Sequence, residues 1–339
     1  MHIPDGYLSL QTSVPALAAM TPVWAVALNK VKKAVNLRQI PLLALCSAFS
    51  FVIMMFNIPL GASSVHAVGA VLIAIIMGPW AACIAVSVAL IIQAFLFGDG
   101  GILAIGANCF NMAFAMPFTG YAIYKLVSGE SKMLSRRSSI GIFLGSFTGM
   151  NIAALLTAIE FGIQPLLFKA ADGTPLYGFY PLSVSVPAIM FEHLLIAGPI
   201  EGIVTLSAVA YLVKFNPQIF LKSLNTSTDT AKSVLSEYRN FIIGLTVLIF
   251  AAPLGLIATG TAWGEWGTEE IQEMLGYIPQ GFAKLSNTWS AMLPDYSVPG
   301  LDKSFFQSST GYILSGIIGV AMIFTVMFIS SKLITKKEN

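Results

Sequence analysis

The stretch that decides the fold runs from Val65 to Phe97 and reads VHAVGAVLIAIIMGPWAACIAVSVALIIQAFLF. The pair Gly78-Pro79 divides it into a short apolar run, 65–77, and a longer one, 79–97. About 20 apolar residues are needed to cross the hydrocarbon core of a bilayer, so the second run is long enough alone. The first run is either half of one broken helix or the first arm of a tight helical hairpin, and the charges elsewhere in the chain decide between them.

The rest of the chain is equally apolar. Of its 339 residues, 56% are hydrophobic and only 10% are charged, whereas soluble domains carry about 25% charge. This composition predicts an all-α membrane protein that crosses the bilayer many times. Nine apolar segments are candidate transmembrane helices, namely 8–29, 41–58, 65–77, 79–97, 105–127, 140–161, 185–213, 241–258 and 312–334.

Basic residues support nine spans. Four segments, 30–39, 125–137, 214–239 and 332–337, hold all of the 18 Lys and Arg residues except Lys169, Lys284 and Lys303. Cytoplasmic loops of membrane proteins are enriched in Lys and Arg. With nine spans every basic segment lies on the cytoplasmic side, the N-terminus lies outside and the C-terminus inside. Merging 65–77 with 79–97 would place 125–137 on the wrong side, so the hairpin is preferred.

The first residues, Met1 to Gly6, read MHIPDG. An α-amine, the following backbone nitrogen and His2 Nδ1 can close two fused chelate rings around one metal ion. Such a planar set of nitrogens suits Ni(II) or Cu(II), and less strictly Co(II). The set lacks a fourth ligand. The alternative is an ordinary chain start with a solvated histidine.

His66 is the candidate for the fourth ligand. It follows the outside loop 58–65 and begins the short run 65–77, which rises only about 20 Å as a helix. We therefore expect His66 in a pocket recessed below the outer surface, on the same side of the membrane as Met1 and His2. The alternative is a histidine whose polar atoms are satisfied at a helix start.

Other polar residues lie within apolar segments. Asn108 and Asn111 share one helix face and either hold the N-terminal segment or join two helices. Glu192, His193 and Glu201 are ionisable groups in the seventh span, where such residues usually have a function. Glu192-His193 is not the HExxH of zinc proteases, so a zinc protease is poorly supported. The roles of the three residues are left open.

The chain changes character after residue 215. A Ser- and Thr-rich stretch predicts a cytoplasmic linker over 216–240, and 241–339 predicts a module of two spans with an outside segment at 259–311. This module contains no His and no Cys. We therefore predict that it adds no ligand to the metal site.

Several of these motifs together resemble a known family. MHIPDG, the loop ending at His66, Phe97-Gly98-Asp99-Gly100-Gly101 and Gly106-Ala107-Asn108…Asn111-Met112 are similar to the nickel/cobalt substrate-capture subunits of energy-coupling-factor transporters. The resemblance covers about 1–215, and the tail resembles the small two-span companion subunit of those systems. One departure is the loop Ser63-Ser64-Val65-His66-Ala67-Val68-Gly69, which is commonly richer in glycine.

The resemblance implies a site and a fold. The metal ligands would be the Met1 amine, the backbone and side-chain nitrogens of His2, and His66. Asp5, Asn108, Asn111 and His193 would surround these ligands. Residues 1–215 would form a seven-helix metal-capturing part in a prokaryotic cell membrane.

The resemblance also implies a function and partners. The protein would bind Ni(II) or Co(II) as transported ligand, without a catalytic cofactor. Its partners would be a membrane coupling subunit, ATPase subunits and the lipid bilayer, but no nucleic acid. The chain has no GxxxxGK[ST] motif, so ATP hydrolysis would belong to a partner. The alternative is an intramembrane metalloenzyme that uses the same nitrogens, and the choice between nickel and cobalt stays open.

Overall fold

The computed structural model describes all residues except 37–38, 61–62, 222–233, 259 and 335–339. Within these residues, each of the nine predicted apolar segments contains a helix, and the only sheet has two short strands. The predicted all-α membrane fold is therefore confirmed. Residues 222–233 of the linker predicted at 216–240 lie outside the described residues, as do the last basic residues of the chain.

Six of the described helical runs are long and apolar enough to cross a membrane: Leu10–Ala34, Pro79–Phe97, Arg136–Leu167, Leu182–Phe215, Arg239–Ile257 and Phe305–Ser330. The other predicted spans are shorter or contain more polar residues. In chain order the helical elements of the first part are α1 (Leu10–Ala34), α2 (Ile40–Met54), α3 (Ala70–Met77), α4 (Pro79–Ile92), η2 (Gln93–Phe97), α5 (Ile105–Asn108), η3 (Cys109–Ala115), α6 (Met116–Ser128), α7 (Arg136–Leu167), α8 (Leu182–Glu192), η4 (His193–Ala197), α9 (Gly198–Phe215) and α10 (Gln218–Leu221). Those of the second are α11 (Val234–Glu237), α12 (Arg239–Ala251), η6 (Ala252–Ile257), α13 (Thr268–Leu275), α14 (Gln280–Leu285), η7 (Pro294–Tyr296) and α15 (Phe305–Ile334).

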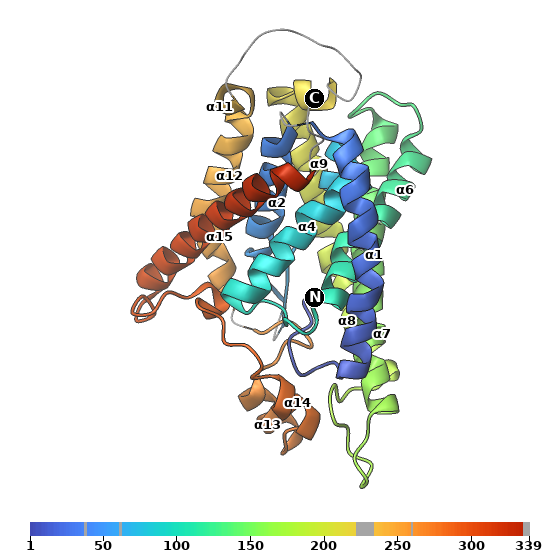
Figure 1. Ribbon diagram of the computed structural model, residues 1–339, viewed down its shortest axis with the longest axis vertical. Helices are drawn as coiled ribbons and strands as arrows, with labels where there is room; N and C mark the ends of the chain where they lie inside the picture. The colour runs from blue at the N-terminus through green and yellow to red at the C-terminus, as the bar shows by residue number, and fades with distance from the viewer. Residues whose placement is uncertain (37–38, 61–62, 222–233, 259, 335–339) are drawn as a thin grey trace.

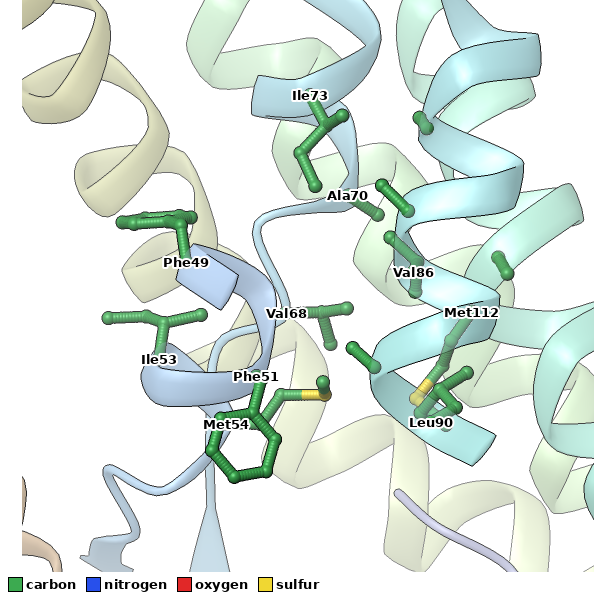
Figure 2. Close-up of a cluster of buried hydrophobic side chains, with 14 of the residues drawn as sticks. Phe49, Phe51, Ile53, Met54, Val68, Ala70, Ile73, Val86, Leu90 and Met112 are labelled. Atoms are coloured by element: carbon green, nitrogen blue, oxygen red, sulfur yellow. The ribbon is translucent and has the colours of Figure 1, made fainter. Parts of the chain in front are cut away.

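The hairpin predicted at Gly78-Pro79 is present. Gly78 has a φ of 86°, which an L side chain rarely adopts, and Pro79 starts α4 at a position where no backbone N–H is needed. Buried side chains of α2, α3, α4 and η3 form one apolar core around this hairpin (Figure 2).

The loop before α3 is more ordered than the sequence indicated. The helix predicted over 65–77 begins only at Ala70, because Gly69 has a left-handed φ of 73°. Strands β1 (Ile58–Leu60) and β2 (Ser63–Val65) pair in antiparallel register. His66 therefore lies in a short irregular link between a strand and a helix, and not in the first turn of α3 as predicted.

The second part of the chain packs against the first. Helices α12 and α15 both contact α2, and the approach of α15 is close, since a Cβ on Gly319 would lie 2.1 Å from Phe51 Cζ. Tyr312 donates a hydrogen bond to the Met55 carbonyl at 2.9 Å. The segment carrying α13 and α14 lies at the opposite end of the molecule from α11, as Figure 1 shows. This segment sits at the same end as the loops that follow the N-terminus.

Candidate metal centre

The first three residues are inserted into the protein. Met1, His2 and Ile3 are buried, with exposed fractions of 7%, 2% and 0%. Asn108 clamps this segment: its Oδ1 accepts a hydrogen bond from Ile3 N at 2.8 Å, and its Nδ2 donates one to Ile3 O at 3.1 Å. Gly101 N also donates to Ile3 O at 2.8 Å. The N-terminus is thus held between the loop after η2 and the helix α5.

Asp5 also holds this N-terminal segment in place. Its carboxylate accepts hydrogen bonds from the backbone of Ile102 at 3.1 Å and of Leu103 at 2.8 Å. Burial raises the pKa of Asp5, and these backbone N–H groups oppose the rise. A Cβ on Gly101 would lie 2.3 Å from Asp5 Oδ1, so the contact depends on glycine. Asp5 anchors the segment and lies in contact with this loop.

His2 and His66 come together in the structure. Their rings are stacked, with centroids 5.0 Å apart and planes inclined by 23°. His66 Nδ1 lies 3.1 Å from the Ala67 carbonyl oxygen. Burial lowers the pKa of His66, and the nearby α-amine and His2 lower it further. His66 is therefore neutral at neutral pH, which is the state that binds metal ions.

Two ring nitrogens of this pair, Nε2 of His2 and Nε2 of His66, have no hydrogen-bond partner within the described part of the chain. Both side chains are buried, and a buried polar atom without a hydrogen bond requires an explanation. A ligand set for a metal ion with a preference for nitrogen fits these atoms.

Two carboxylates lie beside the proposed metal ligands, and neither of them was proposed as a site residue from the sequence. The α-amine of Met1 forms an ion pair with Glu265 Oε1 at 2.5 Å. His2 Nδ1 lies 2.9 Å from Asp99 Oδ1, an ionic contact without hydrogen-bond geometry. One ligand atom from each of His2, Asp99 and Glu265 can be chosen so that all lie within 4.8 Å of one another. Residues 241–339 place the Glu265 carboxylate beside the Met1 amine, and the prediction that they add no ligand to the metal site, which considered only His and Cys, stays a prediction.

Asp99 is held in place by two further side chains. Tyr296, from the second part of the chain, donates a hydrogen bond to Asp99 Oδ2 at 2.5 Å, and Gln93 Nε2 donates to the same oxygen at 3.2 Å. Burial raises the pKa of Asp99, but the His2 and His66 rings and the Tyr296 hydroxyl outweigh it, so the pKa is lowered overall. Asp99 is therefore charged and points at His2.

Asn111 does not share the role of Asn108. Its Nδ2 donates to Glu160 Oε2 at 2.7 Å and to Thr157 Oγ1 at 3.2 Å. Both partners belong to α7, so Asn111 joins η3 to α7. Of the two roles left open for these amides, Asn108 holds the N-terminal segment and Asn111 joins two helices.

The ionisable residues of the seventh span lie on two sides of the site. His193 Nδ1 is 2.8 Å from the Ile189 carbonyl oxygen, and His193 and Glu192 line a small cavity with Met1. Glu201 is fully buried and accepts backbone hydrogen bonds from Val68 at 2.8 Å and Gly69 at 2.9 Å. Glu201 therefore fixes the link that carries His66, whereas His193 is near the site without contacting its rings.

Comparison with known proteins places this geometry in a family. Residues 2–219 match the family described as the cobalt uptake substrate-specific transmembrane region. The chain belongs to this cobalt uptake family. Residues 239–336 match a second family, the PDGLE domain. His2, His66 and Asp99 lie in the cobalt uptake region, and Glu265 and Tyr296 lie in the PDGLE region.

Two relatives match this chain over nearly its whole length. The fused nickel transport protein NikMN of Rhodobacter capsulatus is 46% identical, with 95% of each chain covered. The probable fused nickel transport protein LarMN of Lactiplantibacillus plantarum is 41% identical, with 94% of each chain covered. A crystallised transition metal transporter matches 66% of this chain and 98% of its own, with 51% identity and a TM-score of 0.61.

Proposed function

We propose that this protein captures Ni(II) or Co(II) outside the cell as the substrate-binding subunit of an energy-coupling-factor importer. The ligands are the Met1 amine, the backbone nitrogen and Nδ1 of His2, and His66 Nε2. The observation that carries the proposal is the burial of Met1 and His2 against His66, with Nε2 of both rings free of hydrogen bonds among the described residues. Four nitrogens around one ion are the donor set that square-planar Ni(II) favours.

The surroundings support this chemistry. Metal binding requires the amine and the imidazoles to be unprotonated, so protons are released when the ion binds. Asp99 lies beside the His2 ring and is oriented by Tyr296 and Gln93. Because Asp99 Oδ1 contacts His2 Nδ1, the nitrogen assigned to the metal, this contact is exchanged for the bond to the ion when the metal binds. Asn108 and Glu201 fix the two segments that must meet, at Ile3 and at Val68–Gly69.

We propose that the chain is organised in three parts. Residues 1–215 capture the metal, 216–240 link the two parts in the cytoplasm, and 241–339 form a two-span module with its outer segment at 259–311. The N-terminus faces outside and the C-terminus faces the cytoplasm of a prokaryotic cell. A coupling subunit and ATPase subunits supply the energy, since the sequence contains no GxxxxGK[ST] motif. The relatives described above are nickel transport proteins, which favours transport over a metalloenzyme.

Calorimetric titration of the purified full chain tests the proposal. We expect saturable binding of one Ni(II) or Co(II) ion per chain and no comparable binding of Mg(II), which prefers oxygen ligands. Mass spectrometry must first establish that Met1 carries a free amine. Equal binding of Mg(II) and Ni(II), or no binding of either transition metal, would refute the proposal.

A further inference from the structure

Glu265 lies on the boundary between solvent and the buried nitrogens. The Met1 side of the ion pair has an exposed fraction of 1%, whereas the Glu265 side chain has 19%. On its other side, Glu265 lines a cavity with Asp5, Gly98, Gly101 and Trp266. Anything that approaches the amine from this cavity meets the Glu265 carboxylate first.

The cavity has room for a hydrated metal ion. Its volume is about 210 Å³, and a water molecule occupies about 30 Å³ in the liquid. Its walls are formed by the N-terminal segment, the glycine-rich loop after η2 and the outer segment of the PDGLE part. Glu265 is the residue that this cavity shares with the ion pair at the Met1 amine.

Two carboxylates and an imidazole lie close together beside the Met1 amine. Oxygens of Asp99 and Glu265 and a nitrogen of His2 lie within 4.8 Å of one another. The His2 ring is buried, and its Nε2 has no hydrogen bond to described residues. Oxygen donors hold first-row divalent ions more loosely than imidazole or amine does. This group of side chains therefore suits transient binding of the ion better than its final binding.

We propose that Glu265 and Asp99 form an outer capture site for a hydrated divalent metal ion, which passes from there to the nitrogen ligands. This inference rests on the proposed function. The incoming ion takes the place of the Met1 ammonium as the partner of Glu265. The ammonium N–H bond breaks, its proton leaves to water, and the metal exchanges a bound water for the amine nitrogen. The PDGLE part thus supplies a carboxylate to metal capture.

Under this proposal, Glu265 increases the rate at which the metal ion associates with the protein. In the final complex the four nitrogens complete a planar ligand set, and no carboxylate is required. Loss of Glu265 should therefore slow metal association and leave dissociation nearly unchanged. A resident ligand would give the opposite pattern.

Stopped-flow measurement of Ni(II) association and dissociation with the full chain tests the idea. We expect Glu265→Gln to lower the association rate about tenfold or more, in line with the effect of focused charge on association rates, and to change dissociation little. Glu265→Asp, which keeps the charge on a shorter side chain, should fall between wild type and Glu265→Gln. Glu265→Asp also keeps the proposal testable if Glu265→Gln fails to fold.

Glu269→Gln is the matched control. Glu269 is exposed in the first turn of α13, in the same outer segment, and its replacement removes the same charge without touching the Met1 amine. If Glu265→Gln and Glu269→Gln slow association equally, the effect is general electrostatics and the proposal is overturned. An increase in dissociation alone would make Glu265 a resident ligand and would also overturn it. A wild-type chain that binds no nickel would refute the proposed function itself, which separates the two failures.

Discussion

The imidazole rings of His2 and His66 stack with centroids 5.0 Å apart, although they belong to segments that are distant in the chain. Each ring is positioned through the backbone beside it. Asn108 holds Ile3, next to His2, and Glu201 holds Val68 and Gly69, just after His66. The site is therefore assembled by two polar clamps from different helices.

Replacing His66 with alanine tests the fourth ligand. We expect His66→Ala to remain folded and inserted but to weaken Ni(II) binding more than about 100-fold, since the loss of an outer-layer partner alone costs about 10–100-fold. Calorimetry gives the affinity. His193→Ala is the control, because it removes a buried histidine that contacts Ile189 and not the His2 ring. Equal losses in the two variants would remove His66 from the ligand set.

Extending the N-terminus by one glycine should abolish tight binding. The extension converts the Met1 amine into an amide, and Met1, with an exposed fraction of 7%, leaves no space for an extra residue beside Glu265. Most proteins tolerate such additions because their first residues are loosely held. A form tagged at the C-terminus is the control. Tight Ni(II) binding by the extended form, with its N-terminus verified by mass spectrometry, would show that the amine is not a ligand.

We expect replacement of Asn108 to lower metal affinity, and replacement of Asn111 to lower thermal stability instead. Asn108→Ala removes both hydrogen bonds to Ile3 and should release the N-terminal segment, so that metal affinity falls and a protease reaches the first residues. Asn111→Ala breaks the contact of η3 with α7 and should lower thermal stability, at about 1–3 kcal/mol for a buried group left unpaired, with little change in affinity. If metal affinity instead falls only in Asn111→Ala, the clamp is misassigned.

Glu201 should matter for the link that carries His66. Glu201→Ala leaves the N–H groups of Val68 and Gly69 without acceptors, at a cost of about 1–3 kcal/mol for each buried group. We expect a lower melting temperature together with weaker metal binding. Glu201→Gln keeps a carbonyl oxygen and should be intermediate in both measurements. A destabilised Glu201→Ala that binds metal normally would separate Glu201 from the site.

The pH dependence distinguishes nitrogen ligands from carboxylates. Nitrogen ligands must lose protons, so Ni(II) affinity should fall steadily from pH 8 to pH 5.5. Burial lowers the pKa of His66, so protonation of His66 should contribute only at the acid end of this range. Carboxylates of ordinary pKa, near 4, stay ionised throughout. A flat affinity over this range would therefore indicate that Asp99 and Glu265 are the ligands.

Local sequence patterns were sufficient for the helices and for part of the site. Apolar length and the placement of Lys and Arg predicted the helical segments, and Gly78-Pro79 predicted the hairpin, because glycine and proline act on the backbone where they stand. The chemistry of an amine next to His2 likewise needs no other segment. His66 was a candidate because it follows an outside loop at the start of a short apolar run, on the same side of the membrane as Met1 and His2.

Only the tertiary structure decided how these pieces meet. Asn108 and Asn111 share a face on an ideal α-helix, but the chain enters the π-helical turn η3 at Cys109, whose wider turn changes the angular spacing of side chains. Glu265 and Asp99 reach His2 from separate segments. Such contacts depend on how helices far apart in the chain pack, and the periodicity of each helix contains no information about that packing.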